Sequence, residues 1–84
     1  MERKYSKGKW EVFYNENGYA TSIRSNHHIC VMRTHDKQEC NANAKLISAA
    51  PDMLDVLESI ENDNNQIPEF MWIKIKDVIK KATE

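Results

Sequence analysis

The sequence has few of the residues on which several classes of protein depend. It contains two cysteines, Cys30 and Cys40, too few for the dense disulfide framework of a small secreted domain, so we expect both thiols to be reduced. Its two glycines, Gly8 and Gly18, cannot build the glycine-rich loop that holds phosphate groups in many nucleotide-binding enzymes. The composition therefore argues against an exported scaffold and against that kind of enzyme.

Long apolar runs are also lacking. The longest are far too short to cross a bilayer. Residues 1–9 are basic and polar and have no apolar stretch behind them, as a signal peptide would. We therefore expect a protein of the cell interior.

What remains is the composition of a small globular protein. Of the 84 residues, 40% are hydrophobic and 30% are charged, which favours a folded chain over a disordered tail. A chain of this length leaves much of its surface exposed even when folded. We predict a single small domain over residues 1–84 with a thin core.

Charge is divided unevenly along the chain, although the net charge is only −1. Residues 1–45 hold eight Lys/Arg and five Asp/Glu, which gives +3, whereas residues 46–84 hold four and eight, which gives −4. Between Asp52 and Glu69 there are six acids and no base. An acidic surface is expected in the second half.

Three short segments, residues 10–14, 19–23 and 28–32, are rich in the aromatic and β-branched residues that favour strands. Asn15–Gly18 tolerates positive φ and predicts a turn between the first two. Strict alternation would place two sets of side chains on the face to be covered: Trp10, Val12 and Tyr14 from the first segment, and Tyr19, Thr21 and Ile23 from the second.

Residues 37–50 predict a helix that covers this face. Asp36 and Glu39 have the spacing of a capping box at its start. Projected at 100° per residue, its apolar side chains spread over more than half of the circumference, which is wider than a surface helix needs. Its small alanines would let both the sheet and another helix approach, so we expect it in the middle of the fold.

Pro51 predicts the end of this helix and the first turn of the next, at residues 51–62. A polar loop follows, and Pro68 opens a third helix at about residues 68–82. The predicted fold is α+β: a three-stranded antiparallel β-meander at about residues 9–33, followed by three α-helices at about 37–50, 51–62 and 68–82.

Residues 43–54, NAKLISAAPDML, followed by Leu57, resemble the A-N-A-[RK]-L-I-x-A-A-P-[DE]-[LM]-L signature of small proteins encoded by bacteriophages and prophages. Ser48 and Met53 stand where Ala and Leu are commoner, and the closing residues 79–83 are also similar to such proteins. The resemblance covers roughly residues 39–84. It implies an accessory phage protein that works inside a bacterium, and it carries over no catalytic or binding residue.

Metal binding and catalysis have little support in the sequence. The residues that could bind zinc are His27, His28, Cys30, His35 and Cys40, and they form no C-x-x-C or H-x3-H pair. We favour buried thiols and loop histidines, and predict no metal and no cofactor. No Ser-His-acid or Cys-His arrangement is recognisable and the carboxylates fall on a solvated helix face, so we predict a protein that is not an enzyme.

The N-terminal strands leave two interpretations open. Basic residues flank strands that carry aromatic ones: Arg3, Lys4, Lys7, Lys9, Arg24 and Arg33 beside Trp10, Phe13, Tyr14 and Tyr19. Exposed aromatics on a basic surface bind single-stranded nucleic acid. We favour the other interpretation, in which the aromatics form the core under the first helix, and the pI near 6.3 argues against strong phosphate affinity.

The candidate partner-binding residues lie in the second half: Asp55, Glu58, Asn62, Asp63, Phe70 and Ile73. The acidic group is suited to a basic partner surface, including one that normally grips nucleic acid, unless it is simply a solvated helix face. Phe70 and Ile73 indicate a dimer contact or a partner site, unless they pack beneath the loop at residues 62–66.

Together these observations predict a non-enzymatic phage accessory protein in the cytoplasm of the bacterial host. We expect it to bind a host or phage protein and no membrane, as a monomer or homodimer. Inhibition of a host defence system such as CRISPR is the most concrete version of this function. The alternative is a small nucleic-acid-binding protein that uses the basic, aromatic N-terminal strands.

Overall fold

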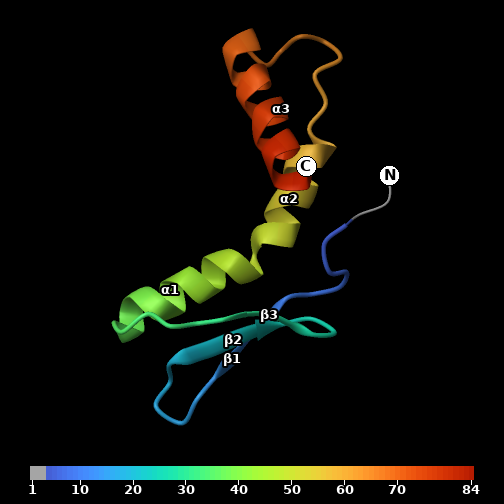
Figure 1. Ribbon diagram of the computed structural model, residues 1–84. Coiled ribbons are helices and arrows are strands. Elements are labelled where there is room, and N and C mark those ends of the chain that lie inside the picture. The colour runs from blue at the N-terminus through green and yellow to red at the C-terminus, as the bar shows by residue number, and fades with distance from the viewer. Residues whose placement is uncertain (1–3) are drawn as a thin grey trace. The chain divides into compact units, whose positions relative to one another are not determined.

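The computed structural model describes residues 4–84, in which three strands precede three helices (Figure 1). The strands are β1 (Glu11–Tyr14), β2 (Ala20–Arg24) and β3 (His28–Val31), and the helices are α1 (Lys37–Ser48), α2 (Ala50–Ser59) and α3 (Glu69–Thr83). The strands pair antiparallel in the order β1-β2-β3. The predicted α+β fold is thereby confirmed.

The turn between β1 and β2 is organised by Asn15. Its side-chain Oδ1 accepts hydrogen bonds from the backbone N–H groups of Asn17 (2.9 Å) and Tyr19 (3.1 Å), and its carbonyl accepts one from Gly18 (3.1 Å). Gly18 has φ +81°, in the left-handed region that costs a residue with a Cβ atom. Residues within the turn therefore determine its conformation, and the turn lies where the sequence predicts it.

The alternation of β2 differs from the sequence prediction because the strand contains a bulge. Phe13 pairs with Ser22 and Tyr14 pairs with Ala20, so Thr21 has no partner in β1. An unpaired residue reverses the in-and-out order of the residues before it. As a result Ala20, and not Thr21, shares the covered face with Ile23, and both are buried. Tyr14, which was expected on the covered face, is 49% exposed although its strand partner Ala20 is buried.

The core of the first part of the chain lies between the sheet and α1, which contacts β2 and β1. Its fully covered members are Ala20, Ile23, Cys40 and Ala44. Partly buried apolar side chains surround them: Trp10, Val12, Ile29, Cys30, Met32 and Ile47. The small side chain of Ala44 allows the helix to lie close to the sheet. Leu46, on another side of α1, is 62% exposed, so the buried arc is narrower than the apolar pattern predicts.

Two side chains of α1 attach the helix to the start of β2. Asn41 Oδ1 accepts a hydrogen bond from the Ala20 N–H (2.7 Å), and Asn41 Nδ2 donates to the Gly18 carbonyl (2.9 Å). The Cys40 thiol donates to the Ala20 carbonyl (3.2 Å). Both backbone groups of the buried residue Ala20 are thus satisfied by α1, beside the bulge.

The helix termini explain the small differences from the predicted ranges. At the start of α1, Asp36 Oδ1 accepts from the N–H groups of Gln38 (2.9 Å) and Glu39 (3.2 Å), as an N-cap does. The helix expected at residues 51–62 ends at Ser59, where the Ile60 N–H bonds to the Leu57 carbonyl in a tighter turn.

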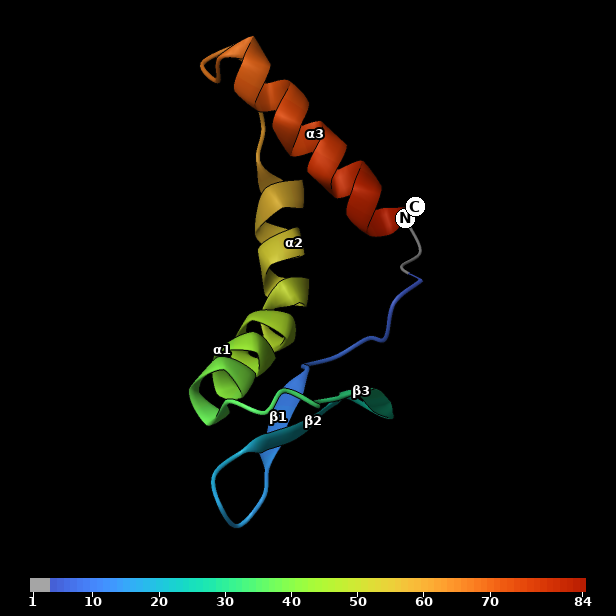
Figure 2. The same cartoon turned by 60° about the vertical axis from the view of Figure 1, so that its left-hand side comes forward.

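The chain forms two compact units, Met1–Pro51 and Asp52–Glu84. The first, as far as the structure describes it, holds the sheet and α1. The second holds most of α2, the loop that follows, and α3, and the chain reverses in this loop so that α3 runs opposite to α2 (Figures 1 and 2). The single domain expected over residues 1–84 stays a prediction.

Candidate functional site

Two of the candidate partner-binding acids, Asp55 and Glu58, lie one turn apart on α2. Residues three apart in a helix share a face, and both side chains are exposed. The remaining acid of this group, Asp63, is exposed in the loop after the helix. The second unit contains four Lys/Arg and eight Asp/Glu, which gives it a charge of −4, whereas Met1–Pro51 carries +3. The charge division of the sequence thus falls at the boundary between the units.

Asn62 has a structural role that the sequence did not reveal. Its side-chain Oδ1 accepts a hydrogen bond from the Ile67 N–H (3.0 Å), and its carbonyl accepts one from Asn65 (3.2 Å). Asn65 has φ 52°, a left-handed conformation that asparagine tolerates better than most residues. Asn62 therefore closes the loop that leads into α3, and its carboxamide oxygen is already used for this purpose.

Phe70 and Ile73 occupy one side of α3. The helix starts after Pro68, whose carbonyl accepts hydrogen bonds from the N–H groups of Met71 and Trp72 (both 3.0 Å). Phe70 is 62% exposed and Ile73 is 45% exposed, which disfavours the alternative that both pack beneath the preceding loop. They form an apolar pair on a helix whose polar surroundings include Asp77.

The open face of the sheet carries a group of residues that sequence reasoning did not assemble. Ser22 lies between Phe13 on β1 and Val31 on β3, and these paired residues point away from α1 because neighbouring Ile23 points towards it. The Arg24 guanidinium carbon is 4.6 Å from the centroid of the Phe13 ring, and Arg24 Nε donates to Ser22 Oγ (3.3 Å). A cation–π contact and a hydrogen bond therefore hold the arginine over the sheet.

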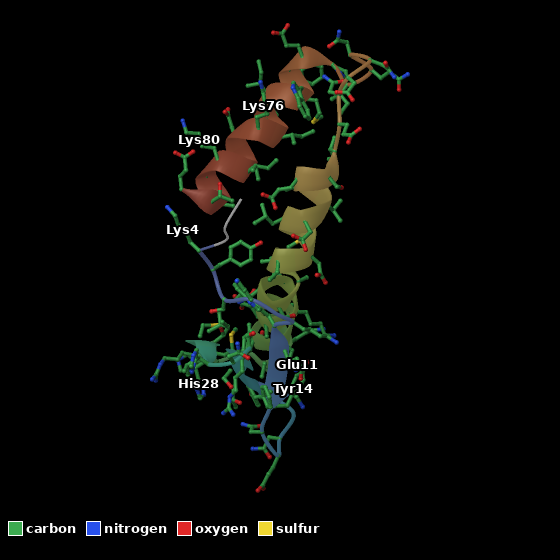
Figure 3. All side chains as sticks on the ribbon, turned by 90° about the vertical axis from the view of Figure 1, so that its right-hand side faces the viewer. Lys4, Glu11, Tyr14, His28, Lys76 and Lys80 are labelled. Carbon is green, nitrogen blue, oxygen red and sulfur yellow. The ribbon has the colours of Figure 1, made fainter. Side chains whose placement is uncertain are left out.

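This arrangement divides the N-terminal aromatics between two environments. Trp10 packs against the core, where its Nε1–H donates to the Ser6 carbonyl (3.1 Å). Phe13 and Tyr14 are exposed, and Figure 3 shows Tyr14 and Glu11 on β1 with His28 on β3. Neither interpretation from the sequence, a core under the first helix or an exposed surface for nucleic acid, describes all of these aromatics. Simple alternation accounts for the exposure of Phe13, whereas Tyr14 is exposed although its strand partner Ala20 is buried.

The possible metal ligands are not gathered by the fold. Within residues 4–84, no three His, Cys, Asp or Glu side chains come together in a way that could hold a metal ion. Cys30 and Cys40 are free thiols, and the Cys40 thiol donates to a backbone carbonyl inside the core. In the same residues, no helix is both long enough and apolar enough to cross a membrane.

Comparison with known proteins identifies a family relationship. A family model described as Salmonella phage P22 protein Y8K6 matches residues 1–84, and so extends beyond the residues 39–84 that carry the resemblance described above. No curated protein and no solved structure matches the chain.

Proposed function

Because the chain belongs to the family of Salmonella phage P22 protein Y8K6, a family of small phage proteins, we propose that it is a non-enzymatic accessory protein that acts by binding another protein inside the bacterial host. The observation that carries this proposal is the exposed apolar pair Phe70 and Ile73 in a unit of net charge −4. Grouped apolar side chains on a polar surface are typical of protein interaction sites.

The acidic side chains of the second unit indicate the charge that we expect on its partner. Asp55 and Glu58 share one face of α2, and Asp63 adds an acid in the following loop. Complementary potentials speed the encounter of two proteins and disfavour partners of the wrong sign. We therefore expect a partner with a basic surface, of the kind that grips nucleic acid.

Inhibition of a host defence system such as CRISPR is the most concrete form of this function. Defence complexes that bind nucleic acid need basic surfaces, and an acidic protein of phage origin is suited to occupy one. The test is the plating efficiency of a targeted phage on hosts that make this protein. Recovery of plaques on a CRISPR-competent host, absent when the host makes a D55K/E58K variant, supports this form, and unchanged restriction refutes it.

The partner itself is tested by affinity capture from host lysate with the D55K/E58K variant. A matched control is E16K/E84K, which makes the same change in net charge at exposed positions in the β1–β2 turn and at the C-terminus. We expect a partner that is captured by the wild type and the control and lost with D55K/E58K. Capture of the same proteins by all three forms would show that the acidic face is not the binding surface.

A second candidate function is supported by the open face of the sheet, where Arg24 lies over the exposed ring of Phe13. Single-stranded nucleic acid binds surfaces that combine aromatic rings with basic side chains. The test is fluorescence anisotropy with a labelled single strand at several salt concentrations. Phe13→Leu should weaken binding while Phe70→Leu, an exposed aromatic in the other unit, should not. Equal affinities of these two variants, or an affinity independent of salt, would remove this candidate.

A further inference from the structure

Residues 52–84 bury very little of their own apolar surface. In α2 the buried side chain is Leu54, and α3, all of which the structure describes, has none. Four large apolar residues of this unit other than Phe70 and Ile73 are at least 43% exposed: Met53, Val56, Met71 and Val78. Units shorter than about 40 residues seldom hold a fold by a core alone and usually need a disulfide, a metal or association.

The first two of these stabilisers are not available to this unit. Both cysteines, Cys30 and Cys40, lie in the first unit, so no disulfide can form within residues 52–84. The described residues 4–84 contain no group that could hold a metal ion. Of the three usual stabilisers of a small unit, association is the one left for residues 52–84.

Apolar residues of this unit form two stripes with the spacing of helices that pack against other helices; Ile60 and Ile75 are half-buried and the other members are exposed. On α2 and the residue after it they form the α2 stripe, Met53, Val56 and Ile60, with intervals of three and four. On α3 they form the α3 stripe, Met71, Ile75, Val78 and Ala82, with intervals of four, three and four. Alternating intervals of three and four align side chains along a helix-packing seam.

These stripes are separate from the surface that we propose for the protein partner. At 3.6 residues per turn, the centre of the α3 stripe lies roughly 140° around the helix from Phe70 and Ile73. On α2, Asp55 and Glu58 likewise lie outside the stripe. One face of each helix is therefore left for a partner of a different kind.

The charges beside the stripes are complementary to each other. Asp52 borders the α2 stripe near the start of its helix, and Lys81, one turn after Val78, lies between the α3 stripe and the side that carries Phe70, near the end of its helix. A patch that meets its own copy across a two-fold axis must be complementary to itself. If α2 of one copy lies antiparallel to α3 of another, Asp52 meets Lys81 twice.

We propose that a second copy of the chain covers the two stripes. α2 of each copy packs antiparallel on α3 of the other, and because α2 and α3 already run in opposite directions within one chain, the result is a four-helix bundle (Figure 2). The dimer displays the surface around Asp55 and Phe70 twice, on the outside of the bundle. This inference does not depend on the proposed function.

The first experiment measures the mass of the full chain by sedimentation equilibrium. We expect twice the chain mass of 9.8 kDa for the wild type, and a monomer for V56E/V78E, which places charge in both stripes. The control F70E/I73E makes the same chemical change on the other side of α3 and should remain a dimer. A wild type that is still monomeric near about 1 mM overturns the proposal, as does loss of the dimer in F70E/I73E with its retention in V56E/V78E.

The second experiment uses charge exchange, which avoids inserting charge into an apolar surface. D52K and K81E should each weaken the dimer at least about threefold, and the combined D52K/K81E variant should regain most of that loss. K80E is the matched control because Lys80 and Lys76 lie one turn apart on a different side of α3 (Figure 3). Equal weakening by K80E and K81E, or no recovery in the combined variant, contradicts the antiparallel α2–α3 contact.

Discussion

Replacing Asn41 should destabilise the first unit far more than replacing its neighbour Asn43. Asn41 joins α1 to β2 through two hydrogen bonds, from Nδ2 to the Gly18 carbonyl and from the Ala20 N–H to Oδ1. Each bond is worth about 1 kcal/mol net, and leaving the buried Ala20 N–H without a partner costs about 1–3 kcal/mol of desolvation. We therefore expect Asn41→Ala to lower the free energy of unfolding by about 2–4 kcal/mol.

Asn43→Ala is the matched control because Asn43 is exposed on the same helix. Both substitutions gain the higher helix propensity of alanine, roughly 0.5 kcal/mol, so the difference between the two variants isolates the contacts of Asn41. The assay is urea unfolding followed by circular dichroism, together with hydrogen exchange of the Ala20 amide. If the two variants unfold within about 0.5 kcal/mol of each other, the two bonds do not hold the helix on the sheet.

Three further predictions concern the same unit. Gly18→Ala should lower the free energy of unfolding in urea by about 1–2 kcal/mol, because Gly18 has φ +81°, which strains a residue with a Cβ atom. The added Cβ would also lie 3.0 Å from Lys37 Nζ, but that flexible side chain can move away. Asp36→Ala should lower the free energy of unfolding by about 1 kcal/mol in the same assay, because the N-cap of α1 is lost. Asp36→Asn should lower it less, because asparagine also caps helices. Equal losses in the two variants would show that the cap is not the cause. In the folded protein, iodoacetamide should label the half-buried Cys30 before Cys40, which is 2% exposed, as peptide mass mapping can show; equal labelling rates would contradict the burial of Cys40.

Features with local causes could be predicted from the sequence. The turn at Asn15–Gly18, the N-cap at Asp36 and the helix break near Pro51 each depend on residues close together in the chain. Their predicted positions agree with the structure to within a few residues. The α2 terminus is the largest difference, because the residues after Ser59 lack a strong stop signal until the polar loop.

Features that depend on distant residues could not be predicted. No residue near Thr21 predicts a bulge, yet this bulge turns Ala20 towards α1. Asn41 falls on the polar side of α1 by periodicity, and its bonds to residues more than 20 positions earlier become visible only in the fold. The open-face group around Phe13 and Arg24 depends on strand register for the same reason.

Only part of the candidate partner site could be predicted from the sequence. The shared face of Asp55 and Glu58 follows from helical spacing alone. The role of Asn62 in closing its loop does not, because the hydrogen bond to Ile67 requires a loop conformation that includes the left-handed Asn65. Asn62→Ala is therefore a poor probe of partner binding, since it would also disturb the start of α3.

The short, irregular sheet has a consequence for how the protein behaves at high concentration. An exposed edge strand is a template for strands of other molecules, and long flat edges lead to fibrils. Here β1 and β3 are four residues each, and both pairings with β2 contain a register shift, at Phe13/Tyr14 and at Ile23/Arg24. Bulges and short edges discourage such templating. The short, bulged edges of this sheet therefore disfavour the addition of a fourth strand from another molecule. Contacts made through the helices carry less risk of aggregation.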